Sequence, residues 1–177
     1  MVLAELINTY RAPLVGLIAS WGAPWADAAE IAQDSLAEAY MNRASCRGDW
    51  SNPHVFGRWL RGVARNVYRN WARARRRRLR MVKFDSAAVE RTVDPPTPEP
   101  TPQIERLRQA IKQLPVHQRQ VVLMHYLEDT NVSQIALLLS VPAKTVEGRL
   151  YQARRSLRRM LENDPPATLP GKVLICL

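Results

Sequence analysis

A dense run of positive charge lies between positions 58 and 83, where the sequence holds eleven basic residues and no Asp or Glu. Guanidinium groups bind phosphate oxygens through paired hydrogen bonds and stack on nucleobases. Five arginines recur at steps of three and four residues, so on a helix they share one side: Arg58, Arg61, Arg65, Arg69 and Arg73. Candidates for base contacts beside them are Phe56, Trp59, Tyr68 and Asn70. The pattern indicates a nucleic-acid partner rather than a solvated face, because so many uncompensated charges repel one another.

The segment before these arginines carries charge of the opposite sign. Acidic residues recur there at steps of three, four and four, along one side of a helix expected from an Asp27 cap to about Met41. DNA repels such a stripe, so it faces water or a basic protein surface; from the residues alone, water is the simpler interpretation. Nothing nearby supplies a nucleophile or a buried acid, which disfavours carboxylate catalysis. The four residues are Asp27, Glu30, Asp34 and Glu38.

A second basic element follows residue 133. A short helix capped by Ser133, a turn at residues 140–142 and a longer basic helix have the spacing of a helix-turn-helix. If Val146, Leu150 and Leu157 point inward, the opposite face is polar and suits the major groove of DNA. A plain α-hairpin is the alternative interpretation. The outward residues are then Lys144, Gly148, Tyr151, Gln152, Arg155 and Arg159.

These segments belong to a chain of ordinary globular composition, with 46% apolar and 24% charged residues and a net charge of +10 over 177 residues. Apolar residues recur at helical spacing without sustained strand-type alternation, so we expect an all-α protein. The first helix is expected from about Leu3, interrupted near Pro13 and ended by Gly22. The other helices are expected from Pro53 to about Arg80, over 104–114, over 115–127, and from the turn to a stop at Pro165–Pro166.

A proline cluster divides the chain. Five of its thirteen prolines fall between positions 95 and 102, and such a run favours polyproline II and cannot continue a helix. We therefore expect a semi-rigid linker over residues 85–102. It separates a first domain at 1–84 from a helix-turn-helix domain at 103–163, which is followed by a tail at 164–177.

The remaining residues predict neither a metal site nor a cofactor. Cys46 and Cys176 lie far apart and outside any Cys/His pair, so a disulfide scaffold or zinc site lacks support. The three histidines are dispersed along the sequence. The apolar stretch over residues 12–21 contains a proline and is too short to span a membrane. We therefore expect a cytoplasmic protein with no metal, no cofactor and no membrane insertion.

Two blocks of sequence resemble a known family, the RNA polymerase sigma factors of the extracytoplasmic-function (ECF) type. Residues 27–34 (DAAEIAQD) resemble its D-A-E-D-L-V-Q-E/D helix, and residues 56–66 resemble its F-x-x-W-L-x-x-I-A-R-N motif. Residues 114–119 (LPVHQR) resemble its L-P-x-x-Q-R motif, and residues 135–157 resemble its helix-turn-helix. The two blocks occur in the family's order and lie on either side of a linker, which makes the resemblance specific.

The resemblance implies a role for each surface. The acidic helix would bind core RNA polymerase through Asp27, Glu30, Gln33 and Asp34. The arginine helix and the loop over residues 43–53 would bind the melted minus-ten element, through Arg58, Arg61, Arg65, Asn66, Arg69 and Arg73. The helix-turn-helix would read the minus-thirty-five duplex, through Lys144, Thr145, Gly148, Arg149, Tyr151, Gln152 and Arg155. Family members are also often controlled by an anti-sigma factor.

The sequence departs from the family at four positions. Ala29 replaces an acidic residue, Ser140 the glycine of the turn, Pro142 a capping serine, and Glu147 a residue that is usually Lys. Glu147 places negative charge near phosphate and weakens duplex binding, unless it accepts a hydrogen bond from a cytosine amino group.

Two other functions compete with that of a sigma factor. A stand-alone helix-turn-helix regulator would use the first domain for dimerisation or sensing, but does not require the Trp- and Arg-rich helix. A resolvase-like enzyme would need a nucleophilic Ser or Tyr with clustered partners, and the serines of the first domain show no such arrangement. The sequence thus predicts an alternative sigma factor with no catalytic residues.

Overall fold

The computed structural model describes residues 3–84 and 101–162, and these segments form only helices. The expected all-α class is confirmed. The first half contains α1 (Leu3–Ser20), α2 (Trp25–Met41), the short 3-10 helix η1 (Arg43–Ser45) and α3 (Pro53–Phe84). The second half contains α4 (Pro102–Gln113), α5 (Val116–Leu127), α6 (Val132–Leu139) and α7 (Ala143–Glu162).

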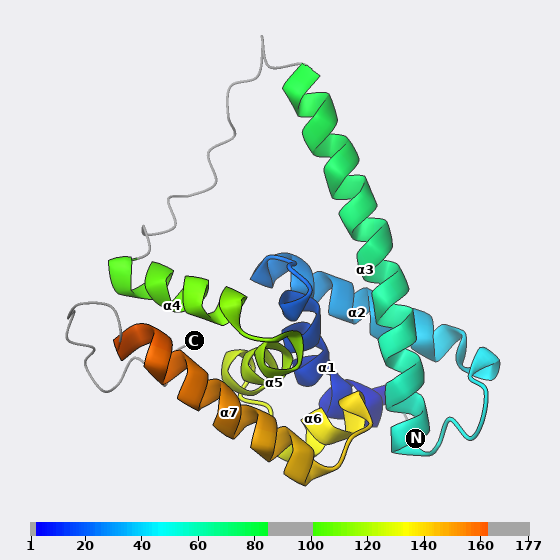
Figure 1. The fold of residues 1–177 in the computed structure, drawn as a ribbon. Coiled ribbons are helices and arrows are strands. Elements are labelled where there is room, and N and C mark those ends of the chain that lie inside the picture. Colours follow the sequence, from blue (N-terminus) through cyan, green and yellow to red (C-terminus); the bar gives the residue numbers. More distant parts are fainter. Residues whose placement is uncertain (1–2, 85–100, 163–177) are drawn as a thin grey trace.

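Helix α1 forms the centre of the molecule and packs against α2, α3, α5 and α6 (Figure 1). The interruption expected at Pro13 is wrong, because α1 continues through this residue. A proline inside a helix removes one backbone hydrogen bond and costs about 3 kcal/mol. Burial of Tyr10, Leu14, Leu17 and Ile18, none more than 1% exposed, offsets that cost and holds the helix together.

Several helices begin at residues other than those expected. Helix α2 starts at Trp25 after Pro24, so Asp27 lies in its first turn, where negative charge is favourable, and does not cap it. Asn131, not Ser133, caps α6, because its side-chain oxygen accepts a hydrogen bond from the Gln134 amide at 2.9 Å. Pro102 is the first residue of α4, so the expected linker extends too far. The rest of that linker (85–100), the tail (164–177) and the Pro165–Pro166 stop lie outside the described residues.

The two halves of the chain share one hydrophobic core. Helices α5 and α6 pack against α1, and α6 also packs against the first turns of α3. The distal part of α3 extends away from the other helices, as the green helix at the top of Figure 1. None of the helices in the described part of the chain is long and apolar enough to cross a membrane. The fold is therefore a closed helical body from which one long helix projects.

Candidate nucleic-acid interface

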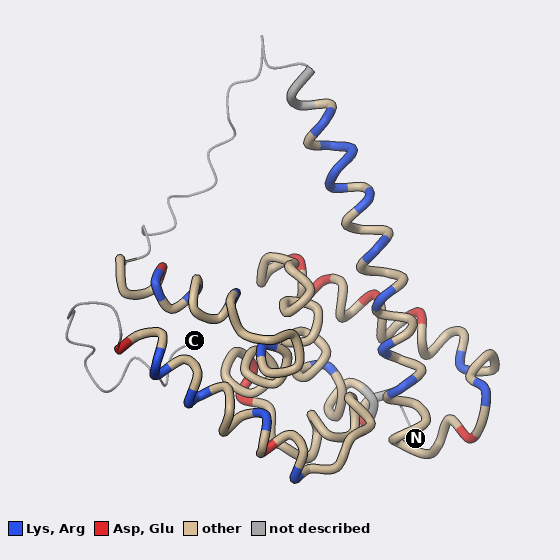
Figure 2. Tube along the Cα trace, in the orientation of Figure 1, with Lys and Arg blue, Asp and Glu red and all other residues tan. Residues whose placement is uncertain are grey.

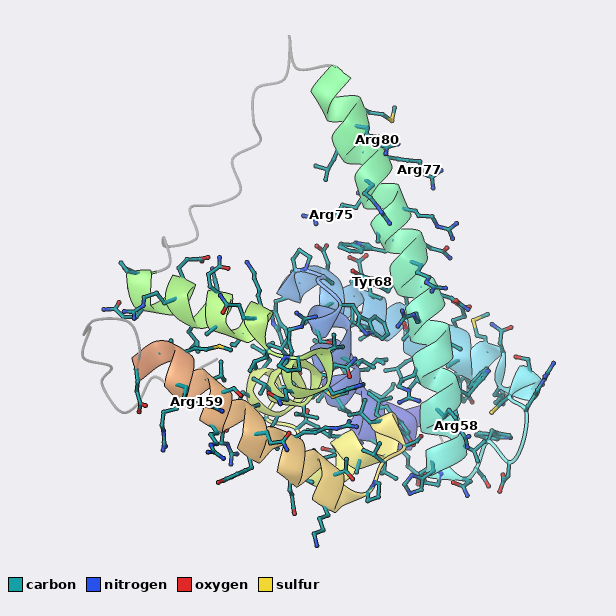
Figure 3. The ribbon with its side chains drawn as sticks, in the orientation of Figure 1. Arg58, Tyr68, Arg75, Arg77, Arg80 and Arg159 are labelled. Atoms are coloured by element: carbon teal, nitrogen blue, oxygen red, sulfur yellow. The ribbon has the colours of Figure 1, made fainter. Side chains whose placement is uncertain are left out.

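Helix α3 presents arginines to solvent along its whole length. Its first turns are anchored by Phe56, Leu60 and Ala64, each fully buried. None of residues 72–81 is buried, and Arg75, Arg77 and Arg80 lie on the projecting part of the helix (Figure 3). Figure 2 shows the resulting line of basic positions on α3. The exposed members of the predicted minus-ten set are Arg58, Arg65, Asn66, Arg69 and Arg73.

Arg61 differs from the other predicted minus-ten residues. Its guanidinium Nη1 donates a hydrogen bond to the backbone carbonyl of Leu139 at 2.7 Å, and Leu139 is the last residue of α6. Burial, with a smaller contribution from the charge of Arg58, lowers the pKa of Arg61. The helical wheel places Arg61 on the basic face, but the packing of α6 makes it a contact between the two halves.

An aromatic cluster made of Trp21, Tyr68 and Trp71 supports the middle of the basic face. The rings of Trp21 and Tyr68 lie 5.4 Å apart, and those of Tyr68 and Trp71 are stacked at 5.7 Å. Arg65 lies over the Trp21 ring at 5.8 Å, and Arg75 lies over the Trp71 ring at 5.5 Å. Cation–π contacts of this kind restrict long side chains that would otherwise sample many rotamers. The part played by Trp21, which directly follows α1, could not be predicted from the spacing of residues on α3.

Phe56 does not serve the base-stacking role considered from the sequence. Its side chain is fully buried, with its ring 5.4 Å from that of Tyr10 and 5.7 Å from that of Trp59. The Tyr10 hydroxyl donates a hydrogen bond to the Pro53 carbonyl at 2.7 Å, and burial raises the pKa of Tyr10 to about 12. Phe56 and Tyr10 therefore fix the start of α3 on α1.

The loop between α2 and α3, expected to meet a melted base, is ordered by local hydrogen bonds. Asp49 Oδ1 accepts from both the amide and the hydroxyl of Ser51, at 2.9 and 2.6 Å, and these bonds lower the pKa of Asp49. Gly48 has a φ of +105°, a conformation that side chains rarely adopt. Asn52 accepts a hydrogen bond from the His54 amide at 3.0 Å at the start of α3.

The acidic stripe lies on the outer surface of α2. Glu30, Gln33 and Asp34 are exposed, and Asp27 is partly buried. The opposite face of α2 is buried against α1 and α3 through Ala28, Ile31, Ala32, Ser35, Leu36 and Ala39. The stripe is therefore available to another macromolecule.

An apolar pocket of about 380 Å³ opens beside Gln33, at the end of the acidic stripe. The pocket has no signature in the sequence, because its walls come from the beginning of α1 and the end of α2. Met41, which is 79% exposed, forms part of its wall. The lining residues are Ile7, Arg11, Gln33, Leu36, Ala37, Tyr40 and Met41.

Helix α7 has the two faces expected of a recognition helix. Val146, Leu150 and Ala153 are buried against the preceding helices. The predicted reading residues Lys144, Gly148, Tyr151, Gln152 and Arg155 are exposed, whereas Thr145 and Arg149 are partly buried. Arg159 lies further along the same helix (Figure 3). Glu147 is exposed on the same helix, and no atom lies within 4 Å of the place where Gly148 would carry a Cβ.

The turn before α7 retains the backbone of a glycine turn although its residue is serine. Ser140 has φ +54° and ψ +47°, in the left-handed region, and its amide bonds back to α6. This conformation costs a non-glycine residue roughly 1–2 kcal/mol. The Ser140 hydroxyl donates a hydrogen bond to the His54 carbonyl of α3 at 3.2 Å, a contact that glycine cannot make.

Residues 3–84 and 101–162 contain no group of three or more His, Cys, Asp or Glu side chains that could hold a metal ion. Cys46, the cysteine among these residues, is buried and unpaired, and burial raises its pKa.

Comparison with known proteins finds similarity to sigma factors. Residues 104–157, which span α4 to α7, match the family model "Sigma-70, region 4". The probable RNA polymerase sigma factor RfaY of Xanthomonas campestris pv. campestris is 32% identical over 137 residues, covering 75% of this chain and 33% of that protein. The ECF RNA polymerase sigma-E factor of Salmonella typhimurium is 26% identical over 164 residues, covering 86% of this chain and 82% of that protein.

A solved structure has the same fold. It contains CnrH in complex with the cytosolic domain of CnrY, and matches with a TM-score of 0.50 and 21% identity over 92% of this chain and 89% of that one. Similarity thus extends over both halves of the chain, beyond the region 4 segment alone. Residues 104–157 match region 4 of the sigma-70 family, and over both halves the chain is similar to RNA polymerase sigma factors of the ECF type.

Proposed function

We propose that this chain is an alternative sigma factor, which binds core RNA polymerase, recognises and melts promoter DNA, and so directs transcription initiation. The observation that carries the proposal is the match of α4–α7 to region 4 of sigma-70 factors. The other half of the chain agrees with it, because α3 bears an exposed line of arginines. Similarity to sigma factors across both halves favours this role over that of a stand-alone helix-turn-helix regulator.

The two basic surfaces suit two forms of DNA. Helix α7 presents a narrow row of polar and basic side chains that fits the major groove, as the minus-thirty-five duplex requires. The arginines of α3, held over the aromatic cluster of Trp21, Tyr68 and Trp71, suit the melted minus-ten strand, where phosphates and unstacked bases are both accessible.

Core polymerase would bind α2. Glu30, Gln33 and Asp34 are exposed on a helix other than α3 and α7, so they are available to a basic protein surface. The apolar pocket beside Gln33 adds a place for an apolar side chain of the partner. The chain acts in the cytoplasm, uses no catalytic residues of its own, and is subject to control by an anti-sigma factor.

Run-off transcription tests this function directly. Purified chain is added to bacterial core polymerase free of other sigma factors, with a pool of genomic fragments as template. Discrete transcripts that depend on the chain are expected, and their aligned upstream sequences give both promoter elements. Absence of transcripts, together with tight salt-sensitive binding of the chain alone to duplex DNA, would establish a stand-alone regulator instead.

Reversing one charge on the acidic stripe tests the polymerase surface. Asp34→Lys is expected to weaken the affinity for core polymerase at least tenfold, because the new cation faces the basic partner surface. The measurement is competition with another sigma factor for limiting core polymerase. Glu105→Lys on α4 changes the net charge equally and is the matched control. Equal behaviour of the two variants would place the polymerase contact elsewhere.

A further inference from the structure

Glu147 places a negative charge on the basic reading face of α7. It lies in the second turn of the helix, one turn after Lys144 and one turn before Tyr151, and all three side chains are exposed. Residues three and four positions apart share a helix face, so the carboxylate enters the major groove wherever these two neighbours do. Figure 2 shows this acidic position among basic ones near the beginning of α7.

The Glu147 carboxylate is available to accept a hydrogen bond. In the part of the chain that the structure describes, it has neither an ion-pair partner nor a hydrogen-bond partner. Glu162, at the other end of the same helix, lies 4.0 Å from Arg158. A carboxylate that enters the groove unpaired loses its water and meets the phosphates, which costs affinity on every sequence that offers it no donor. Glu147 therefore favours a base edge that donates.

Cytosine is the base whose edge fits a carboxylate. It presents the N4 amino group as a donor in the major groove, whereas guanine presents the acceptors O6 and N7, and thymine presents the acceptor O4. Adenine also donates, from N6, but this donor lies between two acceptors, its own N7 and the O4 of the paired thymine. The cytosine donor has an acceptor on one side only, so it leaves room for the second carboxylate oxygen.

Gly148 lets α7 come close enough for a glutamate side chain to reach a base edge. The residue is exposed beside Glu147, and no atom lies within 4 Å of the place where it would carry a Cβ. The Cα atoms of a helix lie about 2.3 Å from its axis, and side chains extend the radius to about 5–6 Å. A missing side chain therefore brings the backbone nearer to DNA. Packing within the protein does not require this glycine, because nothing lies against it.

We propose that Glu147 is a specificity-determining residue, which accepts a hydrogen bond from the N4 amino group of one cytosine and so selects a C·G pair at one position of the duplex site. The exposed backbone at Gly148 makes the approach possible. The negative charge thereby contributes selectivity where it would otherwise only weaken binding. The inference rests on the duplex-reading part of the proposed function, and it holds for a sigma factor and for a stand-alone regulator alike.

The base preference is measured by selection from duplexes with a randomised segment, both by the full chain alone and by the chain assembled with core polymerase. The wild type is expected to select cytosine at one position, and to bind the C·G duplex at least about fivefold more tightly than the duplex with A·T there. Glu147→Gln is expected to reverse this ratio, because a glutamine amide pairs with N6 and N7 of adenine. Preferences at the other positions should stay the same.

The ratio of affinities is the decisive quantity, since removal of a negative charge strengthens binding to every duplex. Glu162→Gln is the matched control: it makes the same substitution on the same helix, and it should keep the wild-type preference for cytosine. If the wild type and Glu147→Gln select the same base at every position, the proposed role of Glu147 is wrong.

Gly148→Ala tests the close approach. Its methyl group meets no atom of the protein, so the helical circular dichroism should be unchanged, but binding to the selected C·G duplex should weaken at least about threefold. Gly62→Ala, equally open on α3, is the control and should bind this duplex as the wild type does. Wild-type affinity of Gly148→Ala would overturn the part assigned to Gly148.

The two selections separate this inference from the sigma function. Failure of every chain in run-off transcription would overturn the sigma function, and the base preference of the chain alone would still test Glu147. A chain that selects no duplex in either form would overturn the duplex-reading role and this inference together.

Discussion

Replacing Arg65 and Arg69 together by alanine is expected to reduce promoter opening about a hundredfold while leaving the affinity for core polymerase unchanged. Both side chains are exposed on α3, whereas the acidic stripe belongs to α2. A charge-assisted hydrogen bond contributes about 1.5 kcal/mol at the low end, so two lost phosphate contacts cost about 3 kcal/mol, or two powers of ten. The measurement is the rate of open-complex formation on a run-off promoter.

Salt dependence separates this effect from a general loss of charge. Two fewer phosphate contacts on single-stranded DNA lower the slope of log affinity against log salt by about 1.4. The control is Arg108→Ala with Lys112→Ala on α4, which removes two exposed positive charges from another helix. If the control loses as much promoter opening as the α3 variant, the net charge of the chain and not the α3 face drives melting.

Helical periodicity was sufficient to predict the class and the faces of single helices. The buried stripe of α7 and the exposed row beside it follow from spacing alone, because both are properties of one helix. Helix boundaries do not follow from spacing alone. Helix α6 is preceded by Asn131 and not by Ser133, and α2 is preceded by Pro24 and not by Asp27. Several residues near each helix start are suited to the capping position, so the sequence does not single out one of them.

Docking between helices far apart in sequence could not be predicted from the helical wheel. The wheel of α3 assigns Arg61 to the basic face, and only the position of α6, 78 residues later, turns it into a contact. Phe56 has the residue type of a base-stacking side chain, but α1 covers it completely. The close approaches of Gly16 to α5 and of Gly57 to α6 have no sequence signature, because glycine in a helix by itself signals only low helix propensity.

Phe56→Ala is expected to lower the free energy of unfolding by about 4 kcal/mol, a large fraction of the total for a domain of this kind. The ring is fully buried and contacts both Tyr10 and Trp59, so alanine leaves a cavity at the junction of α1 and α3. For a chain of this length such a loss lowers the Tm by roughly 8–16 °C. Trp25→Ala, which removes an aromatic side chain that is 41% exposed, is the control and should change stability little.

Two spectroscopic probes then test whether the shared core makes the halves unfold together. All five tryptophans lie in the first half of the chain, at positions 21, 25, 50, 59 and 71, whereas helical circular dichroism reports on both halves. Because α1 packs on α5 and α6 as well as on α2 and α3, the fluorescence and dichroism transitions should coincide in urea, and Phe56→Ala should shift both equally. A second dichroism transition that stays in place while the fluorescence transition shifts would mean that α4–α7 fold independently. The contacts between the two halves would then contribute little to the stability of the protein.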